Sequence, residues 1–218
     1  MATSQLLEKI LKQPDAPQLA EQLQNVLQEE KKRRVAFYNE INEQQKAEFI
    51  NGEVIIHSPV KRPHNEISVN LVKLLDTFVV KYDLGFVGIE KIMISLTRND
   101  YEPDICFFRK EISETFEPEQ VLFPAADLII EILSKKTARK DRGVKFEDYQ
   151  NHGVKEYWII DPKKKMVEKY LLQDSKYELV FKADIGDIES TVLQGFSIPI
   201  EAIFDKKANM EALIKLLA

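Results

Sequence analysis

The chain has 218 residues, enough for one sizeable domain with a helical extension. Its 44% hydrophobic and 31% charged residues are typical of a globular fold and exclude a disordered chain. The net charge of -5 argues against a protein whose whole surface attracts phosphate without specificity, although the local charge can differ from the total.

Several site classes are excluded by what the sequence lacks. A single cysteine, Cys106, excludes an internal disulfide and a multi-cysteine zinc site, and its apolar neighbours indicate a packing role. Neither G-x-G-x-x-G nor G-x-x-x-x-G-K-[ST] occurs, so these nucleotide-binding loops are excluded. There is no signal pattern and no run of roughly 18 apolar residues, so we expect a cytoplasmic protein without membrane contact.

Residues 1–36 read as a helical N-terminal arm. Two apolar stripes with helical spacing are separated by Pro14 and Pro17, and they consist of Leu6, Leu7, Ile10 and Leu11, then Leu19, Leu23, Val26 and Leu27. Two interpretations stay open: the arm packs on its own domain, or it pairs with a second copy. Because such short stripes cover little core alone, we expect a homodimer formed through these helices.

Residues 37–205 read as the main domain. Asn51-Gly52 between two apolar runs predicts a β-hairpin, and a long helix is expected over 65–82. Further strands are predicted at 86–89, 91–96, 105–108, 128–133, 157–160, 166–172 and 177–181. A polar helix is expected over 137–151, and the 206–218 segment carries a closing helix that packs on the domain. This order predicts an α/β fold with a mixed central sheet flanked by helices.

Two apolar strands each carry a carboxylate where a hydrophobic residue is expected. Asp104 opens the run Ile105 to Phe108, and Glu131 lies inside an aliphatic run. A buried carboxylate loses hydration and needs a compensating cation or partner. A divalent ion such as Mg²⁺ would fit, since it takes carboxylate ligands and activates water for phosphate hydrolysis. The alternative is a carboxylate at a strand end or one paired with a buried Lys or Arg.

A basic segment follows Glu131. Six basic residues fall within an 11-residue span, opposed only by Asp141, and they are Lys135, Lys136, Arg139, Lys140, Arg142 and Lys145. They are candidates for gripping nucleic-acid phosphates, although a solvated helix face is the ordinary alternative. Asp141, Lys145 and Tyr149 share one helix face, which predicts that Lys145 points towards Glu131 or forms an ordinary surface pair with Asp141.

Taken together, these motifs resemble the Uma-two family of the restriction-endonuclease-like superfamily, whose hallmark is PD-(D/E)XK. The likeness covers roughly residues 37 to 205, leaves out the arm, and rests on an ordered set of short motifs. They are Gly52-Glu53, His64, Pro103-Asp104, Glu131-Ile132-Leu133-Ser134, Asp141-x-x-x-Lys145-x-x-x-Tyr149, Gly153-Val154 and Glu156-Tyr157-Trp158-Ile159-Ile160-Asp161-Pro162.

The resemblance implies metal-dependent phosphodiester hydrolysis, with Asp104 and Glu131 as the two motif acids. The hallmark lysine should stand at residue 133, which is a leucine, so the resemblance implies that Lys145 replaces it, with Lys135 as the rival. Glu53 matches a family position and is a candidate third metal ligand or a solvated hairpin carboxylate. His64 matches another and is a candidate accessory residue or a helix cap, while Asp141 and Tyr149 are further accessory candidates.

The sequence therefore predicts a Mg²⁺- or Mn²⁺-dependent endonuclease that acts on DNA. Asp104, Glu131 and Lys145 would be catalytic, and Lys136, Arg139, Lys140 and Arg142 would contact the nucleic acid. One alternative is an inactive member of the fold that serves as a dimeric interaction or nucleic-acid-binding protein. Another is a hydrolase that acts on RNA.

Overall fold

The computed structural model describes residues 2–41 and 45–218, and a six-stranded sheet forms its centre. The strand order is β11-β10-β9-β8-β6-β3. In chain order these strands are Gly85–Ile89 (β3), Ile105–Arg109 (β6), Leu128–Ile132 (β8), Glu156–Asp161 (β9), Met166–Gln173 (β10) and Lys176–Ala183 (β11). β8 and β9 run parallel and the other neighbours antiparallel, which makes this a mixed sheet, as the sequence predicted.

A second sheet has the order β2-β1-β5-β4-β7. Its strands are Ala47–Ile50 (β1), Glu53–Ile56 (β2), Met93–Ser95 (β4), Asp100–Tyr101 (β5) and Leu122–Phe123 (β7). The predicted hairpin is confirmed: Asn51 and Gly52 both have positive φ, as the tight turn between β1 and β2 requires. A small third sheet pairs Asp187–Glu189 (β12) with Ser197–Pro199 (β13).

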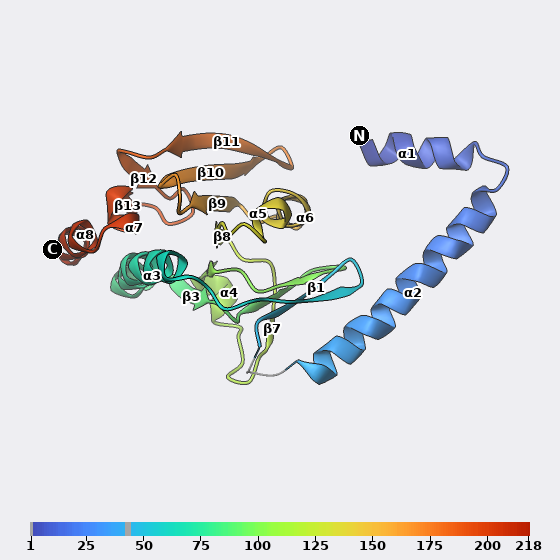
Figure 1. Cartoon of the computed structure of the whole chain (residues 1–218), viewed down its shortest axis with the longest axis horizontal. Helices are drawn as coiled ribbons and strands as arrows, with labels where there is room; N and C mark the ends of the chain where they lie inside the picture. Colours follow the sequence, from blue (N-terminus) through green and yellow to red (C-terminus); the bar gives the residue numbers. More distant parts are fainter. Residues whose placement is uncertain (1, 42–44) are drawn as a thin grey trace.

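Helices cover one face of the six-stranded sheet (Figure 1). They are Arg62–Tyr82 (α3), Glu201–Phe204 (α7) and Lys206–Leu217 (α8). Leu71, Leu74 and Phe78 of α3 pack against inward side chains of β6, β8 and β9, such as Phe107 and Trp158. Burial of this apolar surface is the main stabilising term of the fold. Among the described residues, no helix is long and apolar enough to cross a membrane.

The opposite face of the six-stranded sheet packs against the second sheet and forms a separate core. Side chains alternate along a strand, so Ile105 and Phe107 face the helices while Cys106 and Phe108 face the second sheet. The same alternation in β8 sends Ile129 towards the second sheet, and Glu131, two residues on, points the same way. The carboxylate predicted to be functional therefore lies between the two sheets.

The N-terminal helices are Ala2–Leu11 (α1) and Ala16–Glu40 (α2), so the arm predicted over 1–36 ends inside α2, and only the later part of α2 is anchored. Both carboxylate oxygens of Asp100 accept hydrogen bonds from the Arg34 guanidinium at 2.7 Å. Phe37 enters a small core with Phe49 and Met93. The earlier apolar stripe stays exposed, with Leu23 at 60% and Leu11 at 68%. In Figure 1 the arm stands on the side of the molecule away from α3 and α8.

The predicted single helix over 137–151 is wrong in one respect. The chain forms two short helices, Ala138–Asp141 (α5) and Val144–Asn151 (α6), with a break at Gly143. Gly143 has φ -120° and ψ -104°, which no helix accommodates, and an added Cβ would lie 2.8 Å from the Arg139 carbonyl oxygen. Glycine is therefore required at the point where the chain turns between α5 and α6. The remaining element, α4, spans Lys110–Ser113.

Candidate metal centre

Asp104 and Glu131 lie opposite each other on neighbouring strands. The recorded register pairs Ile105 with Ile130, and one further step along these antiparallel strands places Asp104 across from Glu131. Residues in that relation have Cα atoms roughly 4.5 to 5.5 Å apart and point to the same face. Asp104 Oδ2 also accepts a hydrogen bond from the Ile132 amide at 2.8 Å. The structure thus brings together the two acids that the sequence singled out.

Lys145 reaches these acids from α6. Its Nζ lies 2.8 Å from Glu131 Oε1 and 3.8 Å from Asp141 Oδ1, and the side chain is almost fully buried. The Tyr149 hydroxyl donates to the same Glu131 oxygen at 3.0 Å. The predicted convergence of Asp141, Lys145 and Tyr149 survives the helix break at Gly143. Lys135 is exposed, so Lys145 is the lysine that the structure brings to the acids.

Glu48 is a member of the cluster that sequence reasoning missed. This β1 residue is fully buried, and its Oε1 lies 2.7 Å from Lys145 Nζ. Its other oxygen contacts His57 Nε2 at 2.9 Å. The sequence signal was present, since Glu48 precedes Phe49 and Ile50 in the same hairpin. The hairpin residue predicted from the sequence is Glu53, which is exposed on β2 next to the turn and is not brought to the buried acids.

Asp104 has a second group of partners that come from distant parts of the chain. Lys46 Nζ lies 3.1 Å from Asp104 Oδ1 and 3.3 Å from Glu90 Oε2. His64, in the first turn of α3, places Nε2 3.1 Å from Asp104 Oδ2. The ligand atoms of His64, Glu90 and Asp104 all lie within 4.8 Å of one another. His64 therefore does contact a motif acid, whereas Lys46 and Glu90 were not foreseen.

The pKa values in the cluster reflect burial and a shortage of positive charge. Burial and the repulsion from Asp141, Asp104 and Glu48 raise the pKa of Glu131 to about 8. The positive charge of Lys145 opposes this shift but does not cancel it. Burial also acts on Glu48, but Lys145 and His57 outweigh it and lower its pKa to about 2. Burial lowers the pKa of Lys145, but the carboxylates of Glu131, Glu48 and Asp141 outweigh it and raise this pKa well above its usual range.

The balance of acidic and basic side chains in this cluster suits a divalent cation. Glu48, Asp104, Glu131 and Asp141 are buried carboxylates, and Lys46 and Lys145 are the ammonium groups in contact with them. If all four carboxylates are ionised, they outnumber these two ammonium groups by two, and the raised pKa of Glu131 reflects that repulsion when no further cation is bound. Both oxygens of Asp141 are buried without a hydrogen-bond partner. Uncompensated buried charge is costly, and oxygen ligands of this kind suit Mg²⁺ or Mn²⁺.

The basic residues divide into two groups. Lys135, Lys136 and Arg139 are exposed around the start of α5, where a phosphate backbone can approach. Lys140 is half-buried, and Arg142 forms an ion pair with Glu168. The sequence placed Arg142 among the nucleic-acid contacts, but in this structure its guanidinium already has a carboxylate partner.

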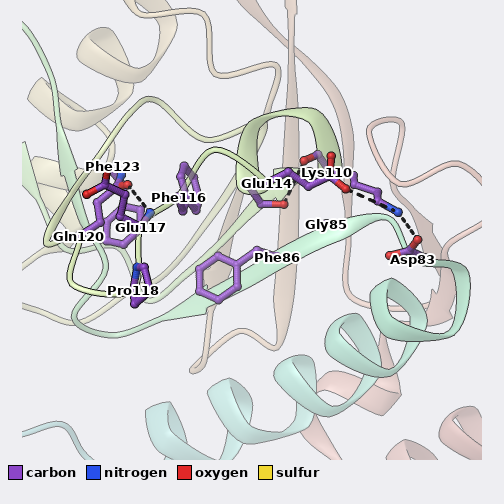
Figure 2. Close-up of a pocket in the computed structure, with 11 residues that line it drawn as sticks. Asp83, Gly85, Phe86, Lys110, Glu114, Phe116, Glu117, Pro118, Gln120 and Phe123 are labelled. Carbon is purple, nitrogen blue, oxygen red and sulfur yellow. Dashed lines mark hydrogen bonds and ion pairs between the residues drawn. The ribbon is translucent and has the colours of Figure 1, made fainter.

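A hollow of about 460 Å³ lies elsewhere, between β3 and the connection from α4 to β7. Figure 2 shows the aromatic rings of Phe86, Phe116 and Phe123 along it and the ion pair of Lys110 and Asp83 at its other end. None of its lining residues belongs to the carboxylate cluster, so this hollow is separate from the candidate site.

Comparison with known proteins shows first the fold class of the chain and then its family. The fold is similar to a crystal structure from Anabaena variabilis described as a "putative nuclease belonging to DUF820". That match has a TM-score of 0.66 and 21% identity and covers 77% of this chain and 94% of the other. This likeness confirms the expected fold class, a mixed α/β architecture shared with that protein, together with N-terminal helices in this chain.

A protein of Synechocystis sp., described only as uncharacterized, is 30% identical over 129 residues. The match covers 58% of this chain and 72% of that protein. Residues 30–201 match the model of the Uma2 family, which carries the description "Putative restriction endonuclease". The chain therefore belongs to the Uma2 family, and the resemblance predicted from its sequence motifs is confirmed.

Proposed function

We propose that the protein is a Mg²⁺- or Mn²⁺-dependent endonuclease that hydrolyses phosphodiester bonds in DNA. The observation that carries this proposal is the buried cluster in which four carboxylates share two ammonium groups. Membership of a family described as restriction endonucleases supports a nuclease class. The acidic cluster supports the metal, because a divalent cation cancels the remaining charge.

Each residue has a distinct role in this proposal. Asp104 and Glu131 are the metal ligands, since they face the same side of adjacent strands. When bound, the metal would lower the pKa of a coordinated water and stabilise negative charge on the phosphate. The Lys145 ammonium, held by Glu48 and Glu131, is positioned to orient that water and to balance developing charge. Glu53 stays a prediction as an additional ligand.

The DNA backbone would approach along the start of α5. Lys136 and Arg139 are exposed there and would contact phosphates, and Lys140 is a further contact. Arg142 would have to exchange its Glu168 partner for a phosphate, so we assign it a weaker contribution. This local patch supplies the positive charge that the acidic protein as a whole lacks.

Plasmid cleavage with Mg²⁺ or Mn²⁺ tests the proposal. We expect cleavage by the wild-type chain and a loss of at least about 100-fold in Asp104→Ala and Lys145→Ala, a typical size for losing electrostatic stabilisation. Asp184→Ala and Lys163→Ala are matched controls at exposed positions and should cleave normally. Equal cleavage by the two site variants would refute the assignment. RNA and single-stranded DNA are tested in parallel, and preferential cleavage of RNA would replace DNA as the substrate.

We also propose that the arm, residues 1–36, pairs with a second copy of the chain, while residues 37–205 form the nuclease domain and 206–218 pack on it. The exposed stripe contains Leu19, Leu23, Val26 and Leu27. Pairing with a second copy would remove this stripe from water. If the chain dimerises but neither binds metal nor cleaves, an interaction protein is the better description.

A further inference from the structure

We propose that Lys46 holds a second cation position beside Asp104, and that a divalent ion takes this position when the ammonium is removed. The position is formed by His64, Glu90 and Asp104. This inference rests on the proposed function in one respect, because the second cation position shares Asp104 with the proposed metal centre. It goes further by setting how many ions the native chain binds.

The ligand set is assembled by three separate elements. His64 comes from the first turn of α3, Glu90 follows β3, and Asp104 precedes β6. Glu90 has φ +56° and donates its amide to the Asp104 carbonyl at 3.1 Å, which ties the two segments together. One nitrogen and two carboxylate ligand atoms then lie within 4.8 Å of one another. This mixture of imidazole and carboxylate donors suits Mn²⁺ and related divalent ions.

A second observation is that a positively charged group, the Lys46 ammonium, already lies among these ligand atoms. The Lys46 ammonium contacts both carboxylates, Asp104 at 3.1 Å and Glu90 at 3.3 Å. It reaches them from the residue that precedes β1, and only 16% of its side chain is exposed.

The consequence concerns metal stoichiometry. In two-metal nucleases both positions beside a shared carboxylate hold divalent ions. Here one position would be filled by an internal ammonium, which supplies positive charge near the phosphate without a second ion. The native chain should therefore bind one divalent ion, at Asp104 and Glu131. Replacing Lys46 with a neutral residue leaves Asp104 and Glu90 facing each other, and a second ion should then bind.

Titration with Mn²⁺ followed by electron paramagnetic resonance counts the bound ions without relying on activity. We expect one ion in the wild-type chain, two in Lys46→Met or Lys46→Gln, and one again when Glu90→Gln is added to either. Lys46→Arg keeps the positive charge and should bind one. Lys73→Met removes an exposed lysine of α3 and should also bind one. Circular dichroism confirms folding of each variant.

The outcomes separate this inference from the proposed function. If Lys46→Met and Lys46→Gln bind the same number of ions as the wild type, the second cation position is refuted. A second ion that persists after Glu90→Gln refutes it as well. If the wild type binds no ion, the metal centre of the proposed function fails. An ion that then appears only in the Lys46 variants and disappears with Glu90→Gln would still support the position described here.

Discussion

At the scale of single residues, Lys145 is the side chain on which the buried cluster depends most. Its ammonium lies within 4.0 Å of Glu48, Glu131 and Asp141, and its side chain is only 3% exposed. Three carboxylates share this cation, so its removal leaves buried negative charge with no local compensation. The arrangement that we propose for catalysis should therefore also contribute to the stability of the domain.

We predict that Lys145→Met lowers the free energy of unfolding by about 3 to 5 kcal/mol at neutral pH without added metal. This is the usual cost of removing one partner of a buried ion pair. Urea unfolding followed by circular dichroism measures the change. Lys163→Met, in an exposed turn, should change stability by less than about 0.5 kcal/mol. A loss of less than about 1 kcal/mol in Lys145→Met would show that the carboxylates protonate or find other partners.

Glu168 gives a prediction about pH. It is buried, which raises its pKa, but hydrogen bonds from Arg142, Lys182 and Tyr170 outweigh this and lower the pKa to about 2. Its stabilisation is therefore complete above the unfolded value of 4.5 and is lost as the pH falls towards 2. Because the two cations are half exposed, we expect about 1 to 2 kcal/mol.

Glu168→Gln should accordingly be less stable than the wild type at pH 7, with a difference that shrinks as the pH falls from 4.5 to 2. Chemical denaturation across this range measures it. A constant difference between the two proteins at all pH values would show that the carboxylate charge is not responsible. Glu178→Gln, at an exposed position on β11, is the matched control and should change stability little.

The residues of the cluster differ in how far the sequence could predict them. Asp104 and Glu131 stood out because they interrupt apolar strands, and the sequence motifs pointed to Lys145. Lys46 and Glu90 carried no such signal, because their importance depends on contacts 58 and 44 positions away along the chain. Only the folded structure brings these side chains together.

At the scale of secondary-structure elements, the apolar stripe of α2 formed by Leu19, Leu23, Val26 and Leu27 stays exposed. We predict that Leu23→Glu with Val26→Glu converts a dimer into a monomer, because charges in an apolar helix interface cost several kcal/mol when buried. Size-exclusion chromatography with light scattering measures the mass. Ile185→Glu, which alters an exposed apolar residue outside the arm, should leave the mass unchanged. A wild-type monomer would refute the dimer.

The start of α5 supports a prediction about DNA binding. Lys136→Ala and Arg139→Ala should each weaken binding to duplex DNA of any sequence and lower the slope of log affinity against log salt by about 1. Fluorescence anisotropy over a salt series measures this. Lys164→Ala, in the turn between β9 and β10, is the control and should not change the slope. An unchanged slope in both α5 variants would move the DNA contact to another surface.

Elements were predicted best where local pattern determines them. The hairpin at Asn51-Gly52 and the amphipathic α3 follow from turn chemistry and helical periodicity. The division at Gly143 was missed, because a single glycine is compatible with a helical pattern and the break depends on the turn from α5 to α6. The short strands β5 and β7 have two residues each, too few for any periodic signal.

At the scale of the whole molecule, the candidate site lies where two sheets and one helix meet. Glu48 comes from the second sheet, Glu131 from the six-stranded sheet, and Lys145 from α6. The sequence predicted a single central sheet, and this description captures the shared fold class but not the second sheet. Glu48 is buried in β1 of that sheet, so the proposed metal centre depends on how the two sheets pack and not on local sequence alone.

A crystal of the wild-type protein soaked in Mn²⁺ shows whether Asp104 and Glu131 bind a common ion, because the anomalous signal locates the ion and its ligands. We expect one peak, coordinated by carboxylate oxygens of both Asp104 and Glu131, with the Lys145 ammonium beside it. Oxygen ligands at about 2.1 to 2.2 Å identify a true coordination site. The absence of a peak between these two carboxylates, at Mn²⁺ concentrations that saturate binding in solution, would contradict this expectation.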